Sequence, residues 1–516
     1  MDKKNNNSEP KTDLGQKLID FSLKHCKMIR ATDGRFYVTL DEKPHIAFAH
    51  SSVNSDAVSE ICSKWFQGSK VWPNQRAASH LSAFLTSKCR SSEPVEVFLR
   101  AGIKDNNLYL DCGDPAYSVY EITPHEYRKC LSSPVLFTRS HVISELPPIA
   151  EGNVAIEEIL RFIRIEKAAL PSVIGCMIAS WMPNIPQPIV FLQGPARSGK
   201  TTSLRKILSL IDPSTDMPGG SLSNNESDMK ALASLRRVFV FDNVSHVDAD
   251  KSDLLARVSS GGEIILRAKY TDDTAHVTQM RRPVYINGIM DGFTRSDLAS
   301  RAINFNLFPI SEREITADSE LNKEWNAYLP FIFTRLLGIT QETLRVLNSD
   351  RPISHSRHRN IDLVQIIDIV GNILGIDGLA YLEESIDSLS SVVLSGNVLG
   401  EALRKTIECS LDWEDSCDHF SIYGMDGETR DLSKTCLFAR SFTSEELRTI
   451  LKNHTPIELQ KELPDTPKKL GEGLKRIEAD LLGLMDVQFK NIRTKRGVKY
   501  EFSRVTAGLE TFEEAI

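Results

Sequence analysis

Hydrophobic and polar positions change their spacing along the chain, and each spacing predicts a different element. Alternation at 95–100 and at 107–111 predicts two antiparallel strands joined by a turn at 105–107. Continuous apolar runs at 189–192 and 237–242 predict buried strands of a parallel sheet. The chain therefore carries both kinds of sheet signal, in separate regions.

Helical spacing follows the first of the buried runs. Apolar residues at 204, 207, 208 and 211 lie on one face of a helix that begins near residue 202. The longest apolar stretch, 168–182, is interrupted by Pro171 and by two serines, so it predicts a core helix rather than a membrane span. Strand, glycine-rich segment and helix then succeed one another, which predicts an α/β unit.

Changes of pattern divide the chain into segments, and the Pro- and Gly-containing stretch 146–153 marks a linker. The predicted segments are a polar, disordered tail (1–13), an N-terminal α+β domain (14–148), a helical segment (149–183), an α/β core (184–310), a helical domain (311–439), a C-terminal domain (440–505) and a tail (506–516).

Composition narrows the class of protein only slightly. The net charge is −7 and 41% of residues are hydrophobic, so any DNA contact must come from local patches. The absence of a signal peptide and of a long apolar run predicts a cytoplasmic protein without membrane contact. The nine cysteines are scattered and form no C-x-x-C pair, which favours reduced thiols over disulfides or structural zinc.

The strongest chemical signal lies between the first buried strand and its helix, where a GxxxxGK[ST] pattern predicts a phosphate-binding loop. Its backbone N–H groups would surround a β-phosphate, Lys200 would neutralise β- and γ-phosphate oxygens, and Thr201 would be a ligand of Mg²⁺. The predicted ATP-binding residues are Gly194, Pro195, Ala196, Arg197, Ser198, Gly199, Lys200, Thr201 and Thr202. A glycine-rich surface turn is the alternative.

Two further strands end in polar residues. Asp242 ends the second apolar run, at the sheet edge where α/β proteins bind ligands, and is predicted to be a second Mg²⁺ ligand. Asn287 ends the run 283–287 and would orient the attacking water beside the γ-phosphate, unless Asn287-Gly288 is only a hairpin turn. Arg295 and Arg301 could reach a nucleotide on a neighbouring subunit, although either could merely pair with Asp297.

Two basic regions are candidates for DNA contact. Glycines followed by an alternating strand at 259–273 predict a projecting hairpin, whose Arg267 and Lys269 would track a single strand in a channel unless it is only a solvated edge strand. The C-terminal segment is predicted to form a helix, a second helix and a basic hairpin, which is the order of a winged helix. It has nine cations and five anions between residues 465 and 500. Its predicted duplex-binding residues are Lys468, Lys469, Lys475, Arg476, Arg493, Lys495 and Arg496. Protein docking is the alternative role.

The set of motifs at 194–202, 238–243, 260–273, 282–288 and 295–301 resembles a family of prophage- and mobile-element-encoded ATP-binding proteins related to the superfamily 3 helicases within AAA+. The resemblance extends to the N-terminal motif 107–114 and to the winged-helix end. It implies a multidomain α/β protein with a P-loop AAA+ core, and a hexameric, ATP-driven role on DNA in replication of a phage or mobile element. A primase or other replication or defence proteins are the implied further partners.

One residue departs from the pattern of the related motors. Many carry an acidic residue directly after the metal-binding Asp, whereas this chain has Asn243, whose amide cannot accept a proton at neutral pH. Asp242 would then be both the metal ligand and the catalytic base, or Asp248 or Asp250 would be the base instead, or hydrolysis is slow. Two functions stay open: a ring-forming DNA helicase or translocase, and a nucleotide-switched DNA-binding adaptor such as an initiator, helicase loader or defence-system scaffold.

Overall fold

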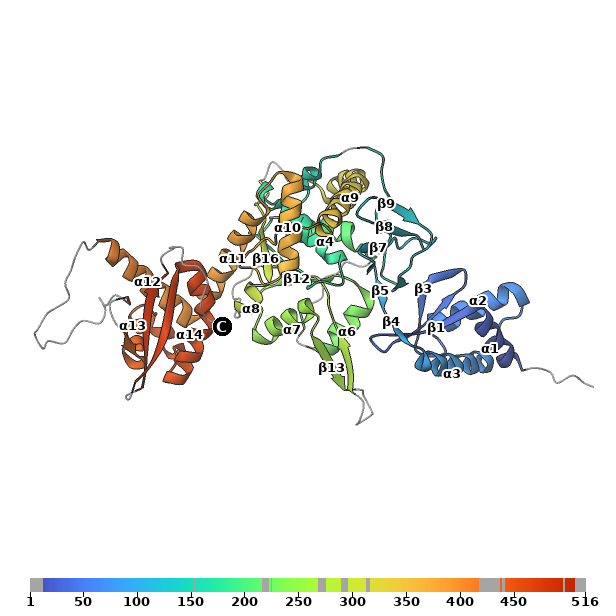
Figure 1. The fold of residues 1–516 in the computed structure, drawn as a ribbon, viewed down its shortest axis with the longest axis horizontal. Helices are drawn as coiled ribbons and strands as arrows, with labels where there is room; N and C mark the ends of the chain where they lie inside the picture. Colours follow the sequence, from blue (N-terminus) through green and yellow to red (C-terminus); the bar gives the residue numbers. More distant parts are fainter. Residues whose placement is uncertain are drawn as a thin grey trace, which may run out of the picture.

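The computed structural model describes residues 13–152, 154–215, 222–223, 225–267, 275–288, 296–311, 316–416, 437–438, 441–494 and 497–505. Within these ranges the chain is a mixed α/β protein with several sheets and many helices. Figure 1 shows a central body with the N-terminal elements α1–α3 on one side and the C-terminal elements α12–α14 on the other. No described helix is both long and apolar enough to cross a lipid bilayer.

Two sheets make up the N-terminal part. The first has the strand order β4-β1-β2-β3-β10-β5, and three helices accompany it. Its elements are α1 (Leu14–His25), β1 (Cys26–Ala31), β2 (Phe36–Leu40), β3 (Lys43–His50), α2 (Asp56–Ser69), α3 (Gln75–Ser91), β4 (Pro94–Val95), β5 (Val97–Leu99) and β10 (Leu136–Thr138). The second is an antiparallel meander of β6 (Ala101–Lys104), β7 (Asn107–Asp111), β8 (Val119–Ile122) and β9 (Tyr127–Cys130).

The strand expected over 95–100 differs from the observed one. β5 pairs in parallel with β10, and β6 is the antiparallel partner of β7. Arg100 has a φ of 68°, so the chain leaves one sheet there and enters the other, a break that alternation cannot reveal. The turn is where it was expected, since Asp105 and Asn106 both have positive φ, which suits a two-residue hairpin loop.

The central body contains a parallel sheet with the strand order β12-β15-β11-β16. The buried strands and the helix expected from the pattern are present, and β11, the strand before the glycine-rich loop, lies between β15 and β16. The elements are β11 (Ile189–Gln193), α5 (Lys200–Ile211), α6 (Glu226–Leu235), β12 (Phe239–Val244), α7 (Ala249–Ser260), β15 (Val284–Gly288), α8 (Ser296–Ala299) and β16 (Ala302–Asn306). A separate antiparallel hairpin of β13 (Glu263–Arg267) and β14 (Ala275–Gln279) extends away from the body (Figure 1).

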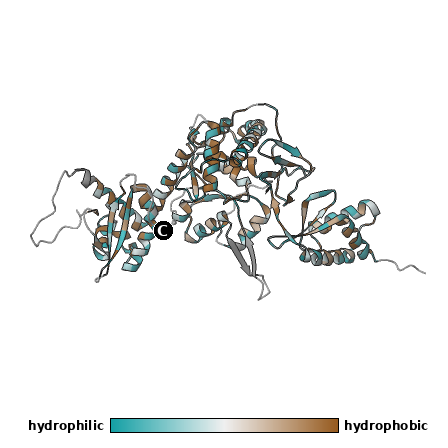
Figure 2. Cartoon of the chain, viewed as in Figure 1, coloured by the Kyte–Doolittle hydropathy of each residue, from teal (hydrophilic) through white to brown (hydrophobic). Residues whose placement is uncertain are grey.

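Apolar helices surround the parallel sheet. The stretch expected to be a core helix is α4, in which every residue is buried, and it packs against α10. Hydrophobic residues are concentrated around these helices in the middle of the molecule (Figure 2). The helices and short 3₁₀ turns are η1 (Ile156–Arg161), η2 (Lys167–Ala169), α4 (Leu170–Trp181), α9 (Asp318–Leu347), α10 (Ile361–Leu374) and α11 (Gly378–Ser395).

The C-terminal part has the helix, helix and hairpin order expected from the sequence. Thr443 and Glu446 form a capping box at the start of α13, and Thr466 caps α14 ahead of Pro467. The helix α12 shares a hydrophobic cluster with these elements and also packs against α11. The elements are α12 (Val398–Ser416), β17 (Phe442–Thr443), α13 (Ser444–Asn453), η5 (Ile457–Glu462), α14 (Pro467–Met485), β18 (Val487–Thr494) and β19 (Gly497–Arg504).

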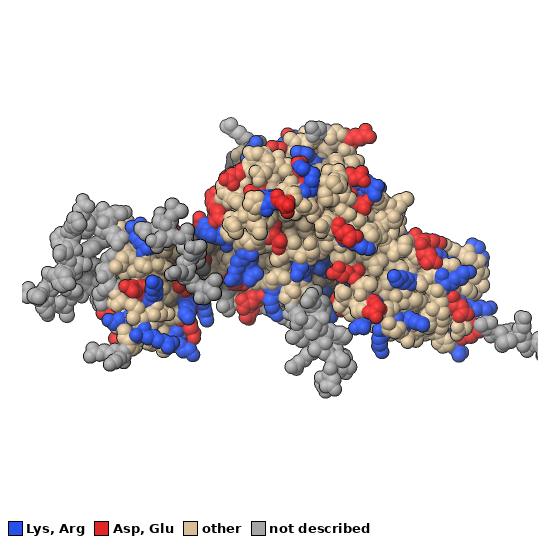
Figure 3. Space-filling model, in the orientation of Figure 1, with Lys and Arg blue, Asp and Glu red and all other residues tan. Residues whose placement is uncertain are grey.

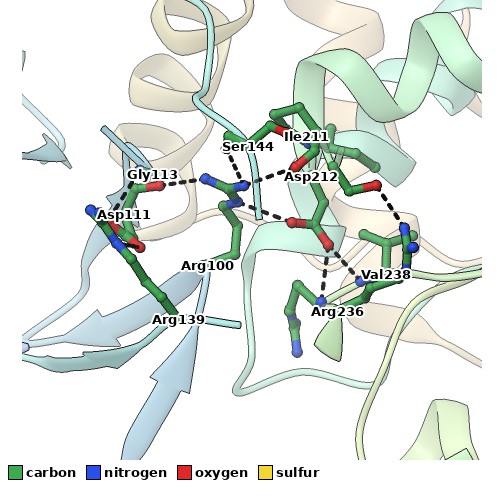
Figure 4. A network of polar contacts seen from close by, with 12 residues as sticks. Arg100, Asp111, Gly113, Arg139, Ser144, Ile211, Asp212, Arg236 and Val238 are labelled. Carbon is green, nitrogen blue, oxygen red and sulfur yellow. Dashed lines mark hydrogen bonds and ion pairs between the residues drawn. The ribbon is translucent and has the colours of Figure 1, made fainter. Parts of the chain in front are cut away.

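A buried polar joint holds the N-terminal part against the core. Arg100 is fully buried and donates from Nε to Asp212 Oδ1 at 3.0 Å. Asp212 follows α5, and its Oδ2 accepts the backbone N–H groups of Arg237 and Val238 just before β12 (Figure 4). Arg100 also donates to the carbonyl oxygen of Asp111, at 2.8 Å. The end of α5, the beginning of β12 and the N-terminal meander therefore meet at one ion pair.

Candidate nucleotide-binding site

The glycine-rich loop connects β11 to α5 at the carboxyl end of the parallel sheet. Three of its residues have positive φ, namely Gly194 (154°), Arg197 (64°) and Gly199 (76°). A Cβ on Gly194 would lie 2.7 Å from Ser198 Oγ and 2.8 Å from the carbonyl oxygen of Leu307, so only glycine fits there. Loop residues Pro195, Ala196 and Arg197 are exposed, and Gly199 precedes the helix, whose N-terminus favours anions.

Two buried polar atoms of this segment lack a hydrogen-bond partner among the described residues. They are Ser198 Oγ, in the loop, and Gln193 Nε2, at the end of β11. Lys200 Nζ lies over the loop, where it donates to the carbonyl oxygens of Gly194 at 2.7 Å and Pro195 at 3.0 Å. A lysine ammonium, a spare hydroxyl and a helix N-terminus in one loop fit a phosphate group.

Three side chains from three elements meet behind the loop. Thr201 Oγ1, in the first turn of α5, lies 3.2 Å from Asp242 Oδ1 on β12. Asn287, at the end of β15 and 2% exposed, donates from Nδ2 to Thr201 Oγ1 at 3.3 Å. A hydroxyl and a carboxylate oxygen are the hard ligands that Mg²⁺ prefers, so Thr201 and Asp242 fit the metal role expected of them. Thr202, the next residue of α5, is half-buried.

The strand that carries Asp242 has an irregular end. The pairing of β12 with β15 shifts register between Phe241 and Val244, and Asn243 adopts a φ of 57°. Its backbone N–H donates to Asn287 Oδ1 at 2.7 Å, and its side chain is exposed. The adjacent Gly288 is required, because a Cβ there would lie 1.9 Å from the carbonyl oxygen of Val244. Both amide atoms of Asn287 are thus engaged, by Thr201 and by Asn243.

The structure also bears on the carboxylates considered as substitute bases. Asp248 is the N-cap of α7: its Oδ1 accepts the backbone N–H of Lys251 at 2.9 Å, and its Oδ2 lies 3.2 Å from Lys251 Nζ. The hydrogen bond from that N–H, together with the ammonium, lowers the pKa of Asp248, which makes it a weaker base. Asp250 is exposed and lines a cavity beside Arg257 and Asp297.

Of the two arginines considered for action in trans, Arg295 lies outside the described residues. Arg301 is half-buried and pairs with Asp297, with Nε to Oδ2 at 3.2 Å. Arg359 pairs with the same carboxylate. The surface pairing raised as an alternative is therefore present for Arg301. An exposed ion pair of this kind contributes about 0–1 kcal/mol, so it would not prevent Arg301 from moving to another anion.

Only some of the residues expected to contact DNA lie within the described part of the chain. The hairpin is confirmed by the pairing of β13 with β14, and Arg267 is opposite Ala275 in its register. Lys269, Lys495 and Arg496 lie outside the described residues. On the C-terminal unit, Lys475, Arg476 and Arg493 are exposed.

The two lysines at the start of α14 have acidic neighbours. Lys469 pairs with Asp465 at 2.8 Å, and Lys468 lies 4.0 Å from Glu472. Lysine and arginine side chains lie along the lower edge of the C-terminal unit on the face shown in Figure 3.

One face of α14 is already covered. It packs against α11, and Ser296 Oγ of α8 lies 2.5 Å from Asp480 Oδ2 and 2.7 Å from the carbonyl oxygen of Arg476. Burial raises the pKa of Asp480, with the hydroxyls of Ser296 and Ser390 opposing the shift. Any duplex on this helix must therefore use the opposite, exposed face.

Sequence reasoning did not find the joint at Arg100. Asp212 precedes Pro213 and follows an apolar helix, which is a local signal for a helix end. Its partner is 112 residues away, and nothing in the local pattern links the two. The joint nevertheless bears on the site, because it fixes the far ends of the two elements that carry Thr201 and Asp242.

Comparison with known proteins gives one family match. Residues 156–392 match the model of the actinomycete integrative conjugative element replication protein family. This segment runs from η1 through the parallel sheet and the nucleotide loop to α11. That part of the chain is thus similar to a replication protein of a mobile element. No curated protein sequence matches the chain.

Among the solved structures that match, three resemble the chain weakly. These three are apo structures of the C-terminal region of NrS-1, two of them described as the A form, and each match covers 95% of this chain. Identities are 9%, 8% and 9%, TM-scores are 0.44, 0.38 and 0.40, and coverage of the NrS-1 chains is 99%, 98% and 99%. TM-scores this low do not establish a shared fold.

Proposed function

We propose that this chain is an ATPase that moves on DNA during replication of a mobile genetic element, with a P-loop core of the AAA+ kind. The observation that carries the proposal is the meeting of Thr201, Asp242 and Asn287 beside the glycine loop, at the carboxyl end of a parallel sheet. Ligands of α/β sheets bind at that edge. The family match of residues 156–392 supports the replication context.

Each group has a role set by its position. Loop residues 194–199 would surround the phosphates of ATP with backbone N–H groups, and Lys200 would exchange two carbonyl oxygens for phosphate oxygens. Thr201 and Asp242 would hold Mg²⁺, which supplies positive charge against the developing negative charge of the reaction. Asn287, held from both sides, would position the attacking water.

Assembly into a ring, a hexamer in the related motors, is part of the proposal. Arg301, and Arg295 beyond the described residues, would then complete the site of a neighbouring subunit. The hairpin β13–β14 would carry Arg267 and Lys269 towards a strand in the central channel, and the C-terminal unit would contact the duplex as a winged helix. Helicase activity is the corresponding prediction for the assembled protein.

The test is ATP hydrolysis with and without single-stranded DNA, for the wild type and Lys200→Ala. Wild-type turnover should rise with DNA, and the variant should fall at least about a hundredfold in turnover, since it lacks the cation that stabilises transferred-phosphate charge. Lys323→Ala is a matched control, because it removes an exposed lysine of α9 that has no proposed role in the site. Hydrolysis insensitive to both DNA and Lys200 would refute the proposal.

A second function is favoured by one observation. The position after Asp242 offers an exposed amide, and Asp248 is engaged as a helix cap. Slow hydrolysis would suit a nucleotide-switched adaptor, in which ATP drives assembly on duplex DNA. Such an adaptor should assemble in the presence of ATP and bind duplex DNA, which sedimentation measures. It should not unwind the duplex in a strand-separation assay. Processive unwinding by the purified protein alone would exclude this second function.

A further inference from the structure

A basic cavity lies between the N-terminal sheet and the core, away from the nucleotide loop. Its volume is about 210 Å³. One wall is the segment that joins β1 to β2 together with β5, and the other is the start of β12 with the residues just before β15. Four arginines line it, from both walls: Arg35, Arg237, Arg281 and Arg282.

Few acidic groups balance these arginines. Arg35 pairs with Asp33 at 2.5 Å, and the other acidic residue of the lining, Glu96, is exposed. For Arg237, Arg281 and Arg282, the described part of the chain provides no carboxylate within ion-pair distance. Four guanidinium groups against two carboxylates leave the cavity with an excess of positive charge.

The hydrogen bonds of Arg237, Arg281 and Arg282 go to neutral groups. Arg237 is 3% exposed and donates to Gln187 Oε1 at 2.7 Å and to the Ser180 carbonyl oxygen at 3.0 Å. Arg281 donates to the carbonyl oxygen of Pro183 at 3.3 Å, and Arg282 to that of Ala233 at 3.2 Å.

Two guanidinium nitrogens of the cavity donate no hydrogen bond to a described residue. The buried Nε atoms of Arg281 and Arg282 have no partner among the described residues. Burial, and then the charge of Arg282, lowers the pKa of Arg237 to about 9. Burial and the charge of Arg35 lower the pKa of Arg282 to about 10. An anion in the cavity would satisfy the spare donors and relieve this repulsion.

The size and the position of the cavity select among anions. A site for a whole nucleotide or drug-sized ligand measures roughly 300–1,000 Å³, so this cavity suits a single phosphate or pyrophosphate group. It lies at the base of the β13–β14 hairpin: a Cβ on Gly261 would be 2.6 Å from Arg281 Nε, and β13 begins two residues later at Glu263. Arginine forks bind phosphate oxygens in pairs.

We infer that this cavity binds a backbone or terminal phosphate of the DNA strand that contacts the hairpin. The inference rests on the proposed function for the identity of the ligand as DNA, but it requires neither hydrolysis nor a ring. It assigns a DNA contact to the seam between the N-terminal part and the core, and so gives residues 14–148 a part in binding.

The first test compares the double variant Arg281→Gln/Arg282→Gln with the wild type. Binding of a fluorescein-labelled oligothymidylate is measured by anisotropy over about 50 to 200 mM salt. The double variant should bind at least about tenfold more weakly, and its slope of log K against log salt should be shallower by about 0.7 for each phosphate that the arginines no longer neutralise. Affinity for a fluorescent ATP analogue should be unchanged.

The matched control is the double variant Arg128→Gln/Arg345→Gln, which removes two exposed arginines that lie elsewhere and pair with glutamates. Equal affinity and equal slope for the two double variants would overturn the inference. Because the first double variant removes buried hydrogen bonds, Glu96→Lys provides a second test that adds charge at an exposed position of the lining. It should tighten oligonucleotide binding about threefold, whereas Glu126→Lys, on the exposed segment between β8 and β9, should not.

The two proposals can fail separately. The wild type could show no DNA-stimulated hydrolysis while oligonucleotide affinity still changes as expected in the Arg281 and Glu96 variants. That result would support phosphate binding in the cavity and refute the proposed ATP-driven movement on DNA. If inorganic pyrophosphate raises the melting temperature of the wild type and not of the double variant, while oligonucleotide binding is equal in both, the DNA assignment is overturned.

Discussion

Asn243 occupies a backbone conformation that few residues tolerate. Its φ is 57°, and its backbone N–H, rather than its side chain, contacts Asn287. Left-handed conformations cost most residues roughly 1–2 kcal/mol but are easier for Gly, Asn and Asp. The backbone at this position therefore disfavours Glu but would accept Asp as readily as Asn.

The first prediction follows from this geometry. Asn243→Gly should keep ATP turnover within about twofold of the wild type, because glycine adopts the same φ and keeps the N–H donor. Asn243→Val should lower stability by roughly 1–2 kcal/mol, since a β-branched residue is strained there. Turnover and melting temperature are measured for both. A fall in turnover above tenfold in the glycine variant would show instead that the side-chain amide acts on water.

Asp480 illustrates a second residue-scale effect. Ser296 has one hydroxyl hydrogen but faces two acceptors, the Asp480 carboxylate and the Arg476 carbonyl oxygen. A protonated Asp480 would resolve the conflict by donating to Ser296. Since burial raises its folded-state pKa, the stability that Asp480 contributes is complete below its unfolded pKa and is lost as pH rises through the folded value.

Asp480→Asn should therefore be at least as stable as the wild type near neutral pH, because its amide can donate at every pH. The melting temperature of the C-terminal unit, followed by calorimetry between about pH 4 and 7, should show the gap in favour of the variant widening with pH. The wild type and Asp465→Asn, which changes an exposed carboxylate, serve as references. A gap that narrows as pH rises would contradict the assignment of a raised pKa.

At the scale of elements, the joint at Arg100 ties three segments together. An unpaired charge left in such a site costs about 3–5 kcal/mol, so Arg100→Met should destabilise the protein by about that amount. Adding Asp212→Asn should recover part of the stability, since the orphaned carboxylate disappears while an oxygen acceptor stays for the N–H groups of β12. Denaturant unfolding of both variants provides the measurement.

Arg128→Met is the control for the joint. Arg128 also pairs with a carboxylate, Glu121, but at an exposed position, and its replacement should destabilise the protein far less than that of Arg100. A destabilisation by Arg100→Met as small as that by Arg128→Met would mean that the joint is not a fixed point between the N-terminal part and the core.

Local pattern predicts elements well and their partners poorly. The strand β11, the glycine-rich loop and the helix α5 follow from spacing and composition over a short window, as do the cap at Thr466 and the hairpin of β18 and β19. The switch between sheets at Arg100 needs a positive φ that alternation does not encode. The basic cavity joins arginines from residues 35 to 282, so only the folded chain brings them together.

At the scale of the whole molecule, α12 packs against both α11 and the C-terminal elements. Its apolar side chains Leu399, Leu403 and Ile407 belong to the same cluster as α13 and α14. A boundary near Gly396 is therefore the alternative to the expected limit at 439. Cores deprived of their covering elements expose apolar patches, which promote association.

A chain shortened to residues 1–439 should therefore bind a hydrophobic dye and associate, because α12 keeps an uncovered apolar face. A chain of residues 1–396 should show less of both, and should keep affinity for an ATP analogue, since the nucleotide loop and its partners lie before the cut. The complementary fragment, 397–516, should fold alone and bind duplex DNA with a salt-dependent affinity. Light scattering, dye fluorescence and anisotropy measure these outcomes. If residues 1–439 stay monodisperse while residues 1–396 aggregate, α12 belongs with the core rather than with the C-terminal unit.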